Sequence, residues 1–130
     1  TNTFAASEAD ILNTVVKDFE SDLVRDTGAE TVDTVEVKSV KGLDVLEKID
    51  SGVYSYGTPP MISKIKRCDE TDCKIFKIET NTTKYGIEFT DVRILLLNKR
   101  GDLIPDMYDF LVEDGLDEIS EEEAELYFFY

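Results

Sequence analysis

The chain has 130 residues, of which 42% are hydrophobic and 10% aromatic, enough apolar material for one core and a single domain over residues 1–130. Its formal net charge is −15, a field that repels phosphate backbones, so nucleic-acid binding is not expected. No segment approaches eighteen consecutive uncharged apolar residues, which excludes a predicted membrane-spanning helix.

Residues 7–23 predict an amphipathic helix. Ser7 and Asp10 form an N-capping signature, and the helix should end before Gly28. Apolar residues follow the cap at helical spacing, namely Ile11, Leu12, Val15, Val16, Phe19 and Leu23. We expect this helix to pack on a sheet.

Residues 31–40 predict a half-buried strand. The segment is rich in β-branched residues, and Val35 and Val37 alternate with Glu36 and Lys38. Apolar residues in 43–49 then suit a short helix or an extended turn.

Residues 53–56 predict another strand. The following residues 57–60 contain Gly57 and a pair of prolines, which predict a rigid connection into the next element.

The two cysteines predict a disulfide-closed hairpin. Two β-rich runs, 61–67 and 74–80, flank a polar four-residue loop bounded by Cys68 and Cys73, so the cysteines would face each other. A loop this short gains about 2 kcal/mol of stability from the chain-entropy term. The alternatives are reduced bystander thiols, a redox-active pair, for which four intervening residues are too many, and a zinc site, for which the chain has no histidine. A disulfide indicates an oxidising compartment, secreted or periplasmic.

Basic residues cluster on the predicted cysteine hairpin of this acidic protein. Five of the fourteen cations lie within fourteen residues: Lys64, Lys66, Arg67, Lys74 and Lys77. The simpler interpretation is an edge hairpin that lysines protect from aggregation. The alternative is a second contact surface, or self-association with the acidic end of another copy.

The rest of the chain predicts further strands and a terminal helix. Segments 85–89 and 92–97 are expected to be strands, and the consecutive apolar residues 94–97 predict a central strand covered on both faces. Residues 98–102 predict a hairpin turn in which Arg100-Gly101-Asp102 is ordinary turn chemistry rather than an adhesion motif. Segment 103–112 holds a strand interrupted by Pro105, and Ser120 with Glu123 forms a capping box for a short C-terminal helix.

The order of elements predicts an α+β fold with a largely antiparallel sheet, an N-terminal amphipathic helix packed on it and a short C-terminal helix. Eight residues are expected to be mostly buried: Ile11, Val15, Phe19, Ile65, Phe76, Ile78, Ile94 and Leu96.

Negative charge is concentrated near the C-terminus. Residues 101–130 carry eleven carboxylates and no side-chain cation, whereas residues 1–100 carry all fourteen cations and eighteen carboxylates. Glu121, Glu122 and Glu123 are explained by helix capping. The remaining candidates for a surface that binds a cationic partner are Asp102, Asp106, Asp109, Glu113, Asp114, Asp117 and Glu118. The alternative is that these carboxylates only keep the protein soluble.

Catalysis has little support in the sequence. The chain contains no histidine, so serine and cysteine nucleophiles have no imidazole partner. The C-terminal aspartates do not follow calcium-loop spacing, and no glycine-rich phosphate loop is present. We therefore expect no catalytic residues, no cofactor and no metal.

In size, acidity and inferred export the chain resembles periplasmic inhibitors and the immunity proteins that neutralise basic toxins, although no sequence motif is shared. The leading hypothesis is a non-enzymatic inhibitor or immunity-type protein whose acidic segment binds a basic toxin or hydrolase. The alternative is an acidic secretion chaperone or envelope assembly factor that acts as a homodimer through apolar surfaces.

Overall fold

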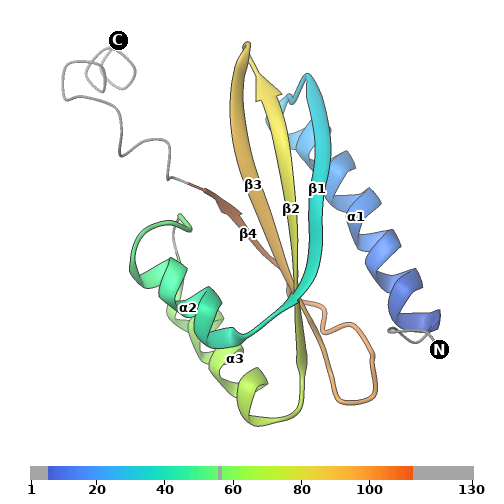
Figure 1. Ribbon diagram of the computed structural model, residues 1–130, viewed down its shortest axis with the longest axis vertical. Helices are drawn as coiled ribbons and strands as arrows, with labels where there is room; N and C mark the ends of the chain where they lie inside the picture. The colour runs from blue at the N-terminus through green and yellow to red at the C-terminus, as the bar shows by residue number, and fades with distance from the viewer. Residues whose placement is uncertain (1–5, 56, 113–130) are drawn as a thin grey trace.

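The computed structural model describes residues 6–55 and 57–112 (Figure 1). The elements in chain order are α1 (Ala6–Thr27), β1 (Thr31–Val40), α2 (Gly42–Asp50), α3 (Pro59–Glu70), β2 (Lys74–Lys84), β3 (Ile87–Leu97) and β4 (Tyr108–Leu111). The predicted C-terminal helix and the acidic residues from Glu113 onward lie outside the described residues.

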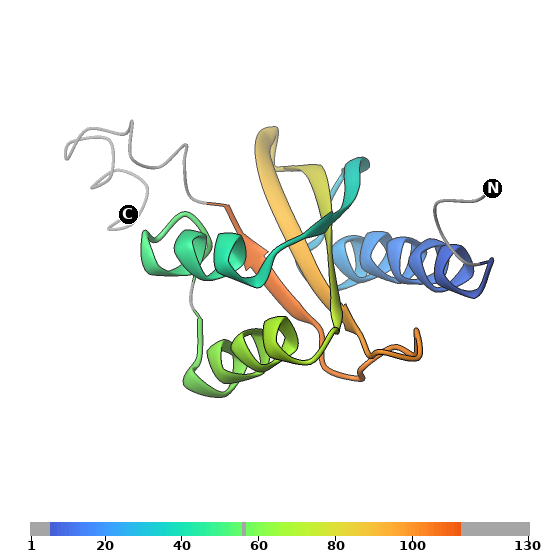
Figure 2. The same ribbon diagram turned by 60° about the horizontal axis from the view of Figure 1, so that its bottom comes forward.

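The four strands form one antiparallel sheet in the order β1-β2-β3-β4. Helix α1 lies on one face of the sheet, and α2 and α3 lie side by side on the other (Figures 1 and 2). The predicted α+β class with an antiparallel sheet is confirmed. Within the described ranges, no helix is long and apolar enough to cross a membrane.

The predicted N-terminal helix is confirmed, and its apolar stripe lies against β2 and β3. Val15 and Phe19 share a core with Phe76 and Leu95. Ile11 packs only at the edge of this core and is half-buried, whereas the other seven residues predicted to be in the core are buried.

The predicted strand 61–67 is wrong, because these residues lie in helix α3. Pro59 and Pro60 occupy the first helical turn, where a missing N–H costs no intrahelical hydrogen bond. Met61, Ile65 and Cys68 then recur at helical spacing and bring Ile65 and Cys68 into the core beneath the helix. The proline pair decided the helix start, and the β-branched residues that suggested a strand are accommodated inside it.

Helix α3 also holds the start of helix α2. The backbone N–H of Gly42 donates a hydrogen bond of 3.0 Å to Asp69 Oδ1. A Cβ atom at position 42 would stand 2.6 Å from that carboxylate, so a larger residue there would displace the Asp69 side chain. The negative side chain also matches the positive end of the α2 dipole.

The predicted strands 85–89 and 92–97 are one continuous strand, β3, so the predicted break is wrong. Tyr85 and Gly86 form the turn between β2 and β3 and have φ values of +54° and +75°. Positive φ at both positions is typical of the two-residue type I′ hairpin. The buried run Ile94–Leu97 confirms the predicted central strand, since β3 lies between β2 and β4.

Strand β1 has the predicted bounds but not the predicted burial. A β-bulge between Thr34 and Glu36 shifts the register against β2 by one residue. Glu36 and Lys38 therefore lie on the face that carries Lys77, while Val35 and Val37 are 47% and 41% exposed. The prediction from alternating residues is wrong here, because the bulge changes which side chains lie on each face of the sheet.

Only part of the segment after β3 forms hydrogen-bonded pairs with the sheet. Leu97 and Leu103 form a single bridge, and β4 then adds four residues at the sheet edge. The predicted strand 53–56 is reduced to one bridge between Tyr54 and Val112. Tyr54 is buried and stacks on Phe110, with ring centroids 5.0 Å apart.

Replacing Tyr85 by asparagine should stabilise the protein. Tyr85 is 93% exposed and adopts positive φ, which asparagine tolerates better than a bulky residue. We expect Tyr85→Asn to raise the free energy of unfolding by about 0.5–1 kcal/mol, measured by urea denaturation. A lower stability would mean that the Tyr85 ring makes a contact worth more than the backbone strain.

Candidate functional site: a basic groove at the disulfide

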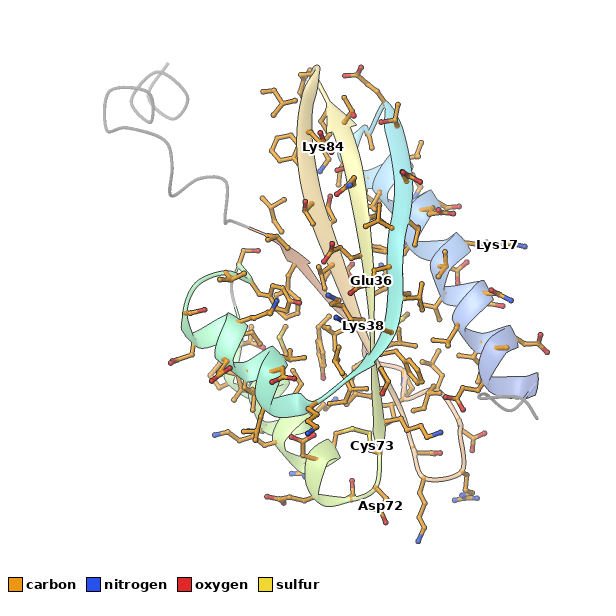
Figure 3. The ribbon with its side chains drawn as sticks, in the orientation of Figure 1. Lys17, Glu36, Lys38, Asp72, Cys73 and Lys84 are labelled. Carbon is orange, nitrogen blue, oxygen red and sulfur yellow. A yellow bond between two sulfur atoms is a disulfide. The ribbon has the colours of Figure 1, made fainter. Side chains whose placement is uncertain are left out.

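The predicted disulfide is confirmed, but it joins a helix to a strand. Cys68 in the last turn of α3 is bonded to Cys73, one residue before β2, with their Cα atoms 4.9 Å apart. Asp72 has a φ of +57° and turns the chain back within this short loop. Figure 3 shows Asp72 and Cys73 at the lower end of the sheet, beside α3.

The turn after β3 lies beside the disulfide, and hydrogen bonds to Asn98 hold its backbone. Its side-chain Oδ1 accepts hydrogen bonds from the backbone N–H groups of Arg100 at 2.9 Å and Asp102 at 3.0 Å. Its own backbone N–H donates to the Asp102 carbonyl, and Gly101 takes a φ of +86°. These bonds fix the backbone that carries Lys99 and Arg100.

The end of α3 and this turn enclose a groove of about 380 Å³, which we call the disulfide groove. Lys64 and Arg67 stand three residues apart on one side of α3, and Lys99 and Arg100 come from the turn. Among the described residues, its lining is Lys64, Arg67, Cys68, Thr71, Cys73, Leu96, Asn98, Lys99, Arg100 and Ile104. Within residues 6–55 and 57–112, four cations and no carboxylate therefore line this concave surface.

Most cations of this groove have no counter-ion among the residues that the structure describes. Lys64 pairs with Asp106, but no carboxylate of the described residues lies within 4.0 Å of Arg67, Lys99 or Arg100. This is unexpected, because residues 1–112 contain twenty-one carboxylates. Like charges that share a concave surface repel one another, and an anion bound among them would relieve that repulsion.

The basic cluster predicted on a hairpin is divided by the fold. Lys64 and Arg67 reach the disulfide groove, whereas Lys74 pairs with Glu8 at 3.3 Å. Lys77 is buried on β2, a central strand, so the predicted edge hairpin is wrong. The groove was missed because 61–67 was assigned to a strand, which separates Lys64 and Arg67 from the turn at 98–102.

The acidic residues predicted to bind a partner lie in different surroundings. Asp102 is exposed in the turn next to the disulfide groove, with no cation of the described residues within 4.0 Å. Asp106 pairs with Lys64, and Asp109 lies on β4 and pairs with Arg93. Glu113, Asp114, Asp117 and Glu118 are outside the described residues. Asp109 therefore has a structural role as a counter-ion of Arg93.

Arg93 is a buried cation held by two carboxylates. Its Nε and terminal nitrogen donate to the two oxygens of Asp109 at 2.7 and 2.8 Å, and the terminal nitrogen also donates to Asp22 at 3.0 Å. Its guanidinium lies 4.6 Å from the ring centre of Phe19. Burial lowers the pKa of Arg93, but hydrogen bonds and charges from Asp109 and Asp22 outweigh this and raise it above its usual value.

Comparison with protein-family models, curated proteins and solved structures found no significant match to this chain. Among the described residues, no group of three or more cysteine, aspartate or glutamate side chains is placed to hold a metal ion. The disulfide groove is thus the clearest candidate site, and its chemistry is that of binding an anion.

Removing the charge of Asp109 should destabilise the protein, because it leaves buried Arg93 with one carboxylate fewer. We expect Asp109→Asn to lower the free energy of unfolding by roughly 1–3 kcal/mol. The matched control is Asp106→Asn, whose ion pair with Lys64 is about half exposed on both sides and should change stability by less than about 0.5 kcal/mol. Urea denaturation of both variants measures the difference, and equal effects would contradict a structural role for Asp109.

Proposed function

We propose that this protein is a non-enzymatic binding protein whose disulfide groove receives a carboxylate-rich segment of a protein partner. The observation that carries this proposal is the absence of a counter-ion, within the described residues, for Arg67, Lys99 and Arg100. Carboxylates of a partner would supply the missing negative charge without displacing an internal ion pair.

The types of residue in the groove favour carboxylates attached to an apolar chain. Arg67 and Arg100 each offer a planar guanidinium, which matches a carboxylate through two parallel hydrogen bonds. Leu96, Ile104 and the disulfide give the groove an apolar floor. A segment in which acidic and apolar residues alternate fits this combination best.

The net charge of the chain limits how such a partner approaches. At −15 the whole protein repels an acidic segment at long range, while the groove attracts it locally. At physiological ionic strength the Debye length is about 8 Å, so the distant carboxylates are screened more than the cations in direct contact. Association should therefore be slow at low salt and should not rely on steering.

The proposal predicts that arginine side chains of the groove control binding of an acidic probe. We would titrate the oxidised protein with a peptide of alternating glutamate and leucine by isothermal calorimetry. The double variant Arg67→Ala/Arg100→Ala should weaken binding on the order of 10- to 100-fold, because it removes two charge-assisted contacts. The control Lys66→Ala lies on the same helix but outside the groove lining and should bind normally.

Equal binding by the wild type and the double variant would overturn the proposal. A second titration uses a peptide in which lysine replaces glutamate. Binding of that basic peptide alone would favour the cationic-partner function described next.

A second candidate function is the inhibitor or immunity type, which uses acidic surface to bind a basic toxin or hydrolase. It is favoured by a groove of about 180 Å³ between α1 and β4. Four aspartates line it, namely Asp22, Asp26, Asp91 and Asp109. The lining residues Asp109 and Leu111 lie just before the acidic segment 113–118 in the sequence. Arg93, Arg25 and Lys84 already neutralise part of the charge of this groove, which is why this function ranks second.

Both candidate functions suit a secreted or periplasmic protein, and the disulfide is compatible with that location. The alternative of a dimeric chaperone or assembly factor has weaker support. Val35 and Val37 are exposed on edge strand β1, but the bulge and the neighbouring Lys38 are features that protect sheet edges from pairing.

A further inference from the structure

A second concave surface lies on the other side of the α2–α3 layer and is separate from the disulfide groove. It is a cavity of about 510 Å³ enclosed by the end of β1, strand β2 and helix α2, and we call it the lysine groove. Its cations are Lys38, Lys41, Lys48 and Lys77, which come from three elements and the loop before α2. Figure 3 shows Lys38 on the sheet above α2, next to Glu36.

Two of these lysines are held in place by carboxylates. Lys77 Nζ lies 2.8 Å from Glu36 and 3.4 Å from Glu79, and Lys38 Nζ lies 3.2 Å from the same Glu36 oxygen. Burial lowers the pKa of Lys77, but the hydrogen bond to Glu36 and the nearby charges raise it overall. Lys77 therefore stays charged at neutral pH although its side chain is only 9% exposed.

The other two lysines differ from these in their surroundings. Within the described residues, no carboxylate oxygen lies within 4.0 Å of Lys41 or Lys48, although Asp44 and Glu47 line the same cavity. Lys48 instead stands over the ring of Tyr54 at 5.5 Å. Because Glu36 and Glu79 already compensate Lys38 and Lys77, Lys41 and Lys48 are the cations of this lining whose charge remains for a ligand.

We propose that the lysine groove binds a compact anion with more than one phosphoryl charge, such as a pyrophosphate or a phosphorylated small molecule. Lysine ammonium groups are compact point charges with freely rotating donors, which suit dense, rounded anions. The described lining of the lysine groove contains no arginine, whose planar guanidinium suits carboxylates, whereas the disulfide groove contains two.

The rest of the lining fits a small molecule attached to the anion. Val40 and Val45 supply an apolar wall, and Ser39 adds a hydroxyl. The volume lies in the range of small-ligand sites. The amide of Gly42 at the start of α2 already donates to Asp69, so the lysines rather than the helix end would hold the anion.

The test is calorimetric titration of the full chain with inorganic pyrophosphate, fructose 1,6-bisphosphate and citrate. Pyrophosphate or the bisphosphate should bind more tightly than citrate. Tighter binding of the bisphosphate than of pyrophosphate would identify a phosphorylated small molecule as the ligand of the lysine groove. The variant Lys41→Gln/Lys48→Gln should weaken binding at least about tenfold, because both contacts are to a charged ligand. It leaves the buried Lys77 cluster intact.

Two controls separate this site from the proposed function. Lys17→Gln changes an exposed cation on α1 (Figure 3), a helix that supplies no described residue to the lining of either groove, and should bind the phosphoryl anion normally. Arg67→Ala/Arg100→Ala should also bind it normally while losing the acidic peptide. The inference is wrong if wild-type protein binds no phosphoryl anion at millimolar concentration, if citrate binds as tightly, or if the Arg67/Arg100 variant loses phosphoryl binding.

Discussion

The bond between Cys68 and Cys73 ties the helical layer on one face of the sheet to its central strands. It fixes the last turn of α3 to the first residue before β2, and Asp69 in that same turn holds the start of α2 through Gly42. These links add to the apolar packing of Val45 and Ile65 on the sheet in fixing the positions of α2 and α3. Both grooves are built on this layer, so the covalent link positions the walls of each.

Most of the cations that line these grooves have no carboxylate partner among the described residues. Seven of the fourteen cations have a carboxylate partner within 4.0 Å among the described residues, and these include the two that are buried, Lys77 and Arg93. Five of the other seven line a groove: Arg67, Lys99, Arg100, Lys41 and Lys48. Internal ion pairs thus satisfy the buried charges, and the remaining cations lie where an external anion could reach them.

Sequence patterns predicted the helix, the strand and the disulfide whose formation depends mainly on residues close together in the chain. The helical spacing of apolar residues from Ile11 to Leu23 predicted α1, and the β-branched run at 31–40 predicted β1. The cysteine spacing predicted the disulfide. Two predictions from local sequence patterns are wrong. In β1, a bulge changes which side chains lie on each face of the sheet. In 61–67, the preceding proline pair and the burial of Ile65 and Cys68 favour a helix over the predicted strand. The disulfide groove combines α3 with a turn thirty residues later, so no single segment could reveal it.

The dependence of anion binding on the Cys68–Cys73 link is the most direct test of this account. The measurement is the dissociation constant of the glutamate–leucine peptide for the oxidised protein and for Cys68→Ser/Cys73→Ser, with circular dichroism to show that both are folded. Losing the link should let the end of α3 move and should weaken binding at least about fivefold, because a preorganised site is lost. An unchanged dissociation constant in a folded variant would contradict the claim that the disulfide positions the groove.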